Sequence, residues 1–236
     1  EAFEYTYMYE GADKAANYSS WTSGSNEGEG FGSWTLSTGG AGGNYLGVTG
    51  LGSSTFGLYA GATGGSNYST ARRDLVMAIP VGSSFSLDLG YTGVANGGEI
   101  GINLFAGGSF RLGFKFIGGG SSWQLNDGGS DFSTGISWSG NTPLSFLFTR
   151  GSGNLYSVQI DQGAQSYTGN NYTASSGTMN IDRIEVYTTG QGSSENVGFD
   201  NPAVHTNFAT VAANADVVVR GLVELDADLI LDNLLI

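Results

Sequence analysis

The sequence predicts an all-β protein: an antiparallel jelly-roll β-sandwich followed by a C-terminal β-strand extension. Three observations carry this prediction. Apolar and polar residues alternate in many short stretches, glycine-rich turns separate these stretches, and no convincing amphipathic helix pattern lies between them. The 236 residues include 41 glycines but only 3 prolines, and 12% are aromatic. This composition is typical of short strands joined by tight turns and excludes a disordered glycine-rich linker.

Period-two alternation marks the predicted strands. It is clearest over residues 3–9, 85–89, 100–104, 110–116, 144–148, 156–160 and 181–187. Every second side chain in these stretches is apolar, so one face of each strand can pack on a core while the other meets water. Turn residues separate the strands, at Gly97-Gly98, Gly107-Gly108, Gly118-Gly119-Gly120, Asp127-Gly128-Gly129 and Gly151-Ser152-Gly153-Asn154.

The end of the chain differs from the rest in composition. Residues 205–236 contain a single glycine and no aromatic residue after Phe208. Three strand-like stretches follow, over residues 217–220, 222–225 and 229–236. We therefore predict two parts: a jelly-roll sandwich over residues 1–204, and a C-terminal strand extension over residues 205–236.

Charge and cysteine content exclude several classes of function. The chain has 21 acidic and 8 basic residues, a net charge of −13, so nucleic acid and anionic membrane surfaces would be repelled. Cysteine is absent, which excludes disulfides, thiolate zinc sites and thiol nucleophiles. No apolar run is long enough to insert in a membrane. The acidic start, Glu1-Ala2-Phe3-Glu4, is interpreted as a mature chain after signal-peptide removal, which predicts an extracellular or cell-surface protein.

Several short segments, in their order along the chain, resemble a group of exported bacterial modules. The segments are Phe31-Gly32-Ser33-Trp34-Thr35-Leu36, Phe56-Gly57-Leu58-Tyr59-Ala60, Ala71-Arg72-Arg73, Phe85-Ser86-Leu87-Asp88-Leu89, Gly113-Phe114-Lys115-Phe116-Ile117-Gly118-Gly119 and Val197-Gly198-Phe199-Asp200-Asn201. The modules are similar to laminin-G/concanavalin-A-like β-sandwiches, and the resemblance covers residues 1 to about 204. It implies a jelly roll in an extracellular setting. The group has no settled activity, so the resemblance implies no catalytic residue.

No constellation of side chains predicts an enzyme. The only histidine, His205, follows the predicted closing strand and has no Gly-x-Ser-x-Gly motif beside it, so an exposed linker histidine is favoured over a catalytic one. Glu99 and Glu185 are the candidates for a glycosidase carboxylate pair. Glu185 alternates with apolar neighbours and is expected to face outward into solvent. We predict no catalytic activity.

Two loops carry acidic residues that could hold calcium through oxygen ligands. The candidate ligands are Glu27, Glu29, Asp127 and Asp131. No EF-hand spacing accompanies them, and solvated turn residues are the alternative interpretation. We expect no cofactor beyond this one candidate structural Ca²⁺.

Aromatic residues in polar loops indicate a second function, a carbohydrate-binding, lectin-like module with an extracellular polysaccharide as its partner. An aromatic ring offers a sugar a flat apolar face with a polar edge. The candidates are Trp123, Tyr68, Tyr167 and Tyr172. In contrast, Trp34 and Trp138 are expected in the core.

Three Asn-x-Ser/Thr sequences are candidate glycosylation sites. They begin at Asn17, Asn67 and Asn171. Such sequences also occur by chance in a chain that is rich in serine and asparagine.

The C-terminal extension leads to the main functional prediction. Its apolar strands would be an aggregation hazard if they were unpaired, and the chain has little Lys or Pro to protect sheet edges. The extension could fold back on its own domain, begin a β-solenoid, or act as a donor strand in the sheet of a neighbouring copy. We predict the last: a non-enzymatic structural protein whose copies form an extracellular filament or surface assembly. The predicted interface residues are Val217, Val219, Leu222, Leu225, Leu229, Leu231, Leu234 and Ile236.

Overall fold

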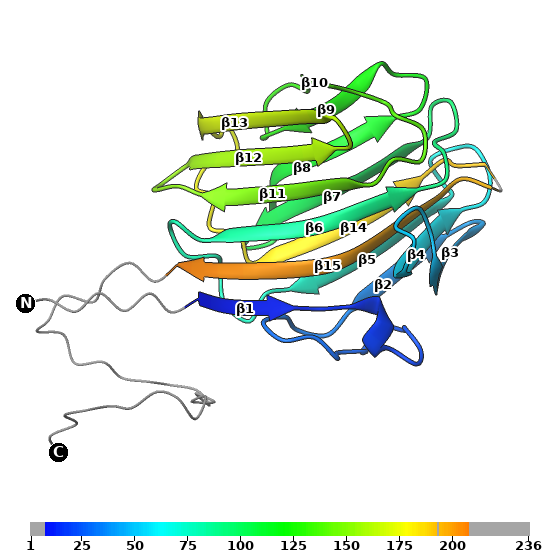
Figure 1. Cartoon of the computed structure of the whole chain (residues 1–236), viewed down its shortest axis with the longest axis horizontal. Coiled ribbons are helices and arrows are strands. Elements are labelled where there is room, and N and C mark those ends of the chain that lie inside the picture. The colour runs from blue at the N-terminus through cyan, green and yellow to red at the C-terminus, as the bar shows by residue number, and fades with distance from the viewer. Residues whose placement is uncertain (1–7, 193, 208–236) are drawn as a thin grey trace, which may run out of the picture.

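Two antiparallel β-sheets pack face to face in a jelly-roll sandwich (Figure 1). The structure, a computed structural model, describes residues 8–192 and 194–207. Its one described helix is the short 3-10 helix η1, Ala15–Asn17. The predicted fold class is confirmed. Within the described residues no helix has the length and apolar character needed to cross a membrane.

The first sheet has eight strands in the order β13-β12-β11-β6-β15-β4-β3, with β1 paired to β15. Strands β1 and β15 lie side by side, so the two ends of the described chain meet in this sheet (Figure 1). The strands are β1 (Met8–Ala12), β3 (Gly42–Val48), β4 (Ser54–Ala60), β6 (Ser84–Tyr91), β11 (Leu144–Arg150), β12 (Leu155–Gln162), β13 (Gln165–Thr173) and β15 (Asn196–Asn207).

The second sheet has seven strands in the order β10-β9-β8-β7-β14-β5-β2. Four of them, β7 to β10, follow one another as a meander, while β14 inserts between β7 and β5. The strands are β2 (Thr35–Gly39), β5 (Tyr68–Asp74), β7 (Glu99–Ala106), β8 (Ser109–Ile117), β9 (Ser122–Asn126), β10 (Phe132–Ser137) and β14 (Arg183–Thr189).

The core lies between the sheets and follows the alternation seen in the sequence. Phe85, Leu87 and Leu89 of β6 are buried, as are Ile184 and Val186 of β14, whereas the residues between them face outward. The predicted stretches from 85–89 to 181–187 fall on β6, β7, β8, β11, β12 and β14, and the predicted turns fall between strands. Stretch 3–9 lies mostly outside the described residues. Strands such as β2 and β13 were not predicted, because they lie at sheet edges and bury few apolar side chains.

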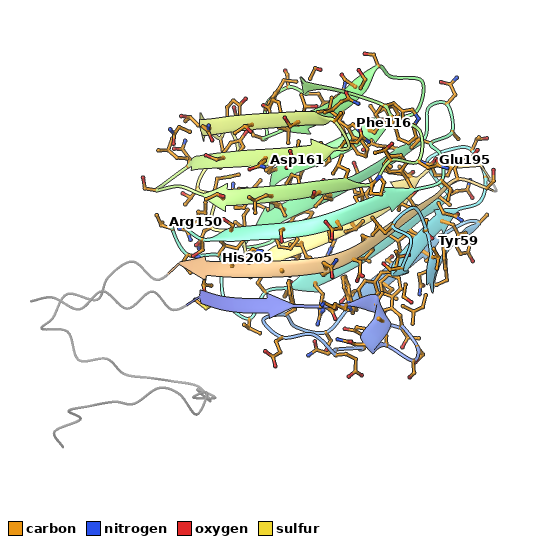
Figure 2. The ribbon with its side chains drawn as sticks, viewed as in Figure 1. Tyr59, Phe116, Arg150, Asp161, Glu195 and His205 are labelled. Carbon is orange, nitrogen blue, oxygen red and sulfur yellow. The ribbon has the colours of Figure 1, made fainter. Side chains whose placement is uncertain are left out.

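Strand β15 continues through His205 to Asn207, although the predicted extension begins at residue 205. The backbone of His205 pairs with Ser84 of β6, and its ring Nε2 is hydrogen-bonded to Ser86 Oγ at 2.9 Å. The interpretation of His205 as an exposed linker residue is therefore wrong: it is half-buried on the outer face of the sheet (Figure 2). Residues 208–236, with the predicted extension strands, lie outside the described residues.

A buried ion pair holds the irregular segment between β1 and β2 against the sandwich. Arg73 of β5 donates from Nη1 to Asp13, and both side chains are completely buried. The guanidinium also donates from Nε to the Gly32 carbonyl at 2.6 Å and lies 4.8 Å from the Trp34 ring. Asp13 further accepts hydrogen bonds from the Tyr18 hydroxyl at 2.9 Å and from Trp34 Nε1 at 3.1 Å. The charge of Arg73 is thus fully compensated inside the protein.

We expect Asp13→Ala to destabilise the protein by about 3–5 kcal/mol, because it leaves the buried guanidinium without a counter-charge. Urea unfolding followed by tryptophan fluorescence measures the change. Asp74→Ala is the matched control. Asp74 pairs with Arg183 at the surface, where its side chain is 61% exposed, so its loss should cost less than about 1 kcal/mol. Equal losses in the two variants would contradict the structural role of the buried pair.

Candidate functional site

The outer face of the seven-stranded sheet carries a shallow groove of about 290 Å³, which we call the mixed-charge groove. Alternation places its residues: Ile100, Ile102 and Leu104 of β7 point into the core, so Glu99 and Asn103 point outward. The lining residues come from four neighbouring strands. They are Glu99 and Asn103 of β7, Phe110, Gly113 and Lys115 of β8, Asn126 of β9 and Tyr187 of β14.

Two glycines inside strands make room for this groove. Gly101 pairs with Tyr187 across β7 and β14, and a Cβ on Gly101 would lie 2.8 Å from the tyrosine ring. Gly113 pairs with Asn103, and a Cβ there would lie 3.1 Å from the Phe110 ring. Only glycine lets these side chains lie so close to the backbone of the sheet. The Phe110 ring is half-buried and contacts Phe105 edge to face, with ring centroids 6.3 Å apart.

Charged groups in the groove are held by defined partners. The Tyr187 hydroxyl donates a hydrogen bond to Glu99 Oε1, and burial together with the charge of Glu99 raises the pKa of Tyr187 above its ordinary value. Lys115 Nζ lies 2.9 Å from Asp131 Oδ2, and Asn126 Nδ2 donates to Asp131 Oδ1 at 2.6 Å. Burial alone would raise the pKa of Asp131, but the hydrogen bonds from Asn126 and Lys115 and the charge of Lys115 outweigh it and lower that pKa.

The two glutamates considered as a glycosidase pair lie on this same face but far apart. Glu99 pairs with Thr189 in the β7–β14 ladder, whereas Glu185 pairs with Asn103. The two glutamates are therefore separated by about 14 Å along the strands. Carboxyl pairs in glycosidases are about 5–5.5 Å or 6.5–9.5 Å apart. The register excludes this pair as catalytic partners.

Glu185 faces outward as predicted but is only 7% exposed, so the expectation that it is solvated is wrong. Arg72 Nη2 donates to its Oε2 at 2.6 Å, and Asn103 Nδ2 donates to its Oε1 at 3.1 Å. The same arginine lies over the Phe105 ring, 5.5 Å from its centroid. Arg72 of β5 and Asn103 of β7, on either side of β14, therefore cover the Glu185 carboxylate.

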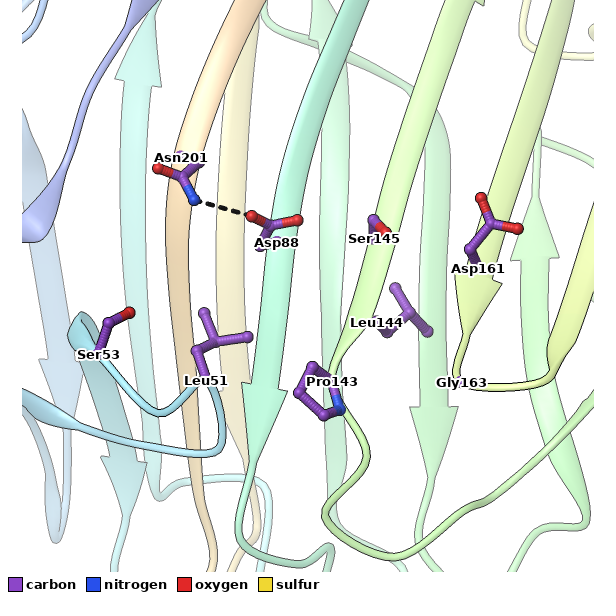
Figure 3. A pocket seen from close by; sticks show the side chains of 9 residues that line it. All are labelled: Leu51, Ser53, Asp88, Pro143, Leu144, Ser145, Asp161, Gly163 and Asn201. Carbon is purple, nitrogen blue, oxygen red and sulfur yellow. Dashed lines mark hydrogen bonds between the residues drawn. The ribbon is translucent and has the colours of Figure 1, made fainter.

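The outer face of the eight-stranded sheet carries a second groove of about 460 Å³, which we call the acidic groove (Figure 3). Ser145 of β11 pairs with Asp161 of β12 on one side and with Asp88 of β6 on the other. Asn201 Nδ2 donates to Asp88 Oδ2 at 2.8 Å. Its other lining residues are Leu51, Ser53, Pro143, Leu144 and Gly163. The lining therefore contains neither an aromatic ring nor a cationic side chain.

Two glycines allow the loop that borders the acidic groove to lie close to the sheet. Gly198 of β15 pairs with Gly90 of β6, and the loop around Thr49 passes over both. A Cβ on Gly90 would lie 2.4 Å from the Thr49 carbonyl oxygen, and one on Gly198 would lie 2.6 Å from Thr49 Cβ. The loop can therefore rest directly on the sheet and bring Leu51 to the rim of the groove.

The four aromatic residues predicted to bind a glycan are not brought together. Trp123 is fully buried in the core, where it stacks on Phe114 with ring centroids 4.8 Å apart, so the expectation that it is free is wrong. It occupies an inward position of β9. Tyr68 begins β5, whereas Tyr167 and Tyr172 hydrogen-bond each other on β13 of the other sheet. The predicted core positions of the other two tryptophans are confirmed. Trp34 is buried, and Trp138 is half-buried and packs on the core.

The candidate calcium ligands have other partners or lie exposed. Asp127 Oδ2 accepts a hydrogen bond from the Tyr156 hydroxyl at 3.1 Å, and Asp131 pairs with Lys115. Glu27 and Glu29 are exposed in the segment before β2. Across residues 8–192 and 194–207, no three His, Cys, Asp or Glu side chains gather as a metal site would require. Calcium binding stays a prediction.

The candidate glycosylation sites differ in their surroundings. Asn17 and Asn171 are exposed, in η1 and in β13. Asn67 is half-buried and its Nδ2, the atom that would carry a glycan, donates a hydrogen bond to the Thr63 carbonyl at 3.2 Å, so a glycan there would disturb a local contact. The predicted assembly residues between positions 217 and 236 lie outside the described residues, and self-assembly stays a prediction.

No family model and no curated protein matches the sequence. Solved structures match it in fold. A chain from a structure of endo-acting O-glycanases of the human gut microbiota that initiate mucin breakdown has a TM-score of 0.55 at 10% identity, over 83% of this chain and 98% of that one. A β-1,3-glucanase from Mycobacterium marinum has a TM-score of 0.51 at 12% identity, over 77% and 94%.

A sialidase also matches, with a TM-score of 0.54 at 12% identity over 73% of this chain. The match spans only 17% of the sialidase chain. At such identities the likeness shows the fold alone. The fold part of the resemblance found in the sequence, a concanavalin-like β-sandwich, is thereby confirmed, while no match identifies a family.

We expect Trp123→Ala to destabilise the protein by about 3–5 kcal/mol, because it empties a large core position. Phe110→Ala, which truncates a half-buried ring on the outer face, should cost clearly less. Urea unfolding of both variants measures the difference. A Trp123 variant as stable as the unmodified protein would contradict its place in the core.

Proposed function

We propose that the protein is a carbohydrate-binding module and that the mixed-charge groove holds the glycan. One observation carries the proposal: the Phe110 ring lies beside outward-facing carboxylate, amide and ammonium groups over a glycine floor. A pyranose has apolar C–H faces and a rim of hydroxyls, so it needs both an aromatic surface and paired donors and acceptors. The acidic groove offers no such ring.

The groove offers both kinds of hydrogen-bonding partner to a sugar hydroxyl. Lys115 is a donor, and its ammonium has more protons than its contact with Asp131 uses. Glu99 and the Oδ1 atom of Asn103 are acceptors, since the Asn103 Nδ2 is committed to Glu185. These side chains stand on strands and are held by neighbours, so little conformational entropy is lost when a ligand binds.

The solved structures of similar fold support the proposal only in the general class of ligand, carbohydrate. They include proteins described as O-glycanases and as a β-1,3-glucanase, both of which act on carbohydrates. Proteins that share a fold need not share a binding site, so the proposal rests on the residues of the mixed-charge groove. An extracellular polysaccharide as partner, and an extracellular location, complete the proposal.

We infer that the module binds without cleaving. On the outer face of the seven-stranded sheet, Glu99 and Glu185 are too far apart to act together, and Asp131 is paired with Lys115. In the acidic groove, Asp88 accepts a hydrogen bond from Asn201, and the lining has no aromatic ring on which a sugar could stack. Release of reducing sugar from a bound polysaccharide, lost in Asp161→Asn, would contradict this inference.

We expect Phe110→Ala and Asn103→Ala to weaken polysaccharide binding at least about fivefold each, since truncation of a central contact commonly costs more than 1 kcal/mol. Affinity electrophoresis on gels that contain β-1,3-glucan, arabinogalactan or mucin measures retardation, and circular dichroism checks that each variant is folded. Asp161→Asn in the acidic groove is the matched control and should bind normally.

Two results would contradict the proposal. Retardation that survives both groove variants but is lost in Asp161→Asn would place the binding site in the acidic groove. An absence of retardation on every polysaccharide, with the protein folded, would remove carbohydrate binding itself.

A further inference from the structure

We propose that the mixed-charge groove selects neutral glycans over sialylated, uronic-acid or sulfated ones, and that Glu99 determines this selectivity. The inference rests on the proposed carbohydrate binding and adds the class of ligand to it. It is drawn from how the charges on this face of the sheet are paired.

Three cations on this face each have a carboxylate partner. Arg72 pairs with Glu185, Lys115 with Asp131, and Arg183 with Asp74. Glu99, the carboxylate that lines the groove, belongs to none of these three pairs. Among the described residues Glu99 forms no ion pair, and its partner is the neutral hydroxyl of Tyr187. The groove thus presents an uncompensated negative charge to its ligand.

An anionic sugar in this groove would meet Glu99 as a like charge at short range. Lys115 is the lining cation, but it could compensate the ligand only by sharing or leaving Asp131, which would expose another carboxylate. The net charge of −13 adds repulsion at longer range. A carboxylate or sulfate on the ligand is therefore unfavourable here.

A neutral sugar meets the opposite situation. Its hydroxyls can donate to the Glu99 carboxylate, and hydrogen bonds to an ionised acceptor are stronger than those between neutral groups. The hydroxyl of Tyr187 fixes Glu99 Oε1 in place, so the acceptor is oriented before the ligand arrives. The same residue that repels anionic glycans thus favours neutral ones.

The experiment compares each neutral ligand with an anionic derivative of it. Isothermal titration calorimetry with the whole chain measures a galactose-terminated oligosaccharide against its sialylated form, and a β-1,3-glucan oligosaccharide against its sulfated form. We expect the neutral member of a pair that binds to be favoured at least about tenfold. Glu99→Gln should reduce that preference at least about threefold. Asp131→Asn, which frees Lys115 on the other side of the groove, should reduce it as well.

Asp161→Asn is the control that distinguishes the effect of the Glu99 charge from the effect of the protein's net charge on ligand preference. It removes one carboxylate from the acidic groove on the other sheet, so it changes net charge as Glu99→Gln does. We expect it to leave the preference for neutral glycans unchanged. An equal shift in Asp161→Asn and Glu99→Gln would overturn the role of Glu99.

The remaining outcomes distinguish this inference from the proposed function. If a sialylated or sulfated ligand binds as tightly as its neutral form, the selectivity is overturned while carbohydrate binding stands. If no member of either pair binds and the gel assays also show no retardation, carbohydrate binding is overturned and the selectivity falls with it.

Discussion

The buried ion pair between Asp13 and Arg73 decides the path of the least regular part of this protein. A guanidinium taken out of water must have its charge and its donors satisfied inside the protein. Here Asp13, the Asn26 side chain and the Gly32 carbonyl all satisfy it. The long segment between β1 and β2, which has no strand of its own, therefore closes over the core along one route and brings Trp21 and Trp34 against Phe56 and Phe199.

The strand that provides this arginine also contributes to the outer face. Arg73 points inward to Asp13, while its neighbour Arg72 points outward to Glu185 and the Phe105 ring. Because successive side chains on a strand face opposite sides, the core can be fixed by one set of residues while the outer face carries another. The mixed-charge groove uses this freedom: its polar residues alternate with the core residues of β7 and β8.

Some residues in and beside the mixed-charge groove are functional candidates in the sequence, but the sequence predicts other roles for them. The sequence indicates Glu99 as half of a glycosidase pair, and it indicates Asp131, the partner of Lys115, as a calcium ligand. Phe110, Lys115 and Tyr187 are predicted only as parts of strands. The glycines inside strands, Gly101 and Gly113, were the signal that could have marked a groove there. The prediction for Trp123 is wrong because its serine and glutamine neighbours are typical of a polar loop, although it alternates with Leu125 as an inward residue does.

The sequence by itself determined the fold class, six of the strands, the turns between them and the absence of thiol chemistry, since the chain contains no cysteine. These properties follow from composition and from a period of two, which are local along the chain. Only the tertiary structure decided which outward-facing side chains meet. Glu99 and Tyr187 are 88 positions apart and contact each other because β14 inserts beside β7. Strand order and register are set by how both sheets bury their apolar faces together, and no single stretch of sequence contains that information.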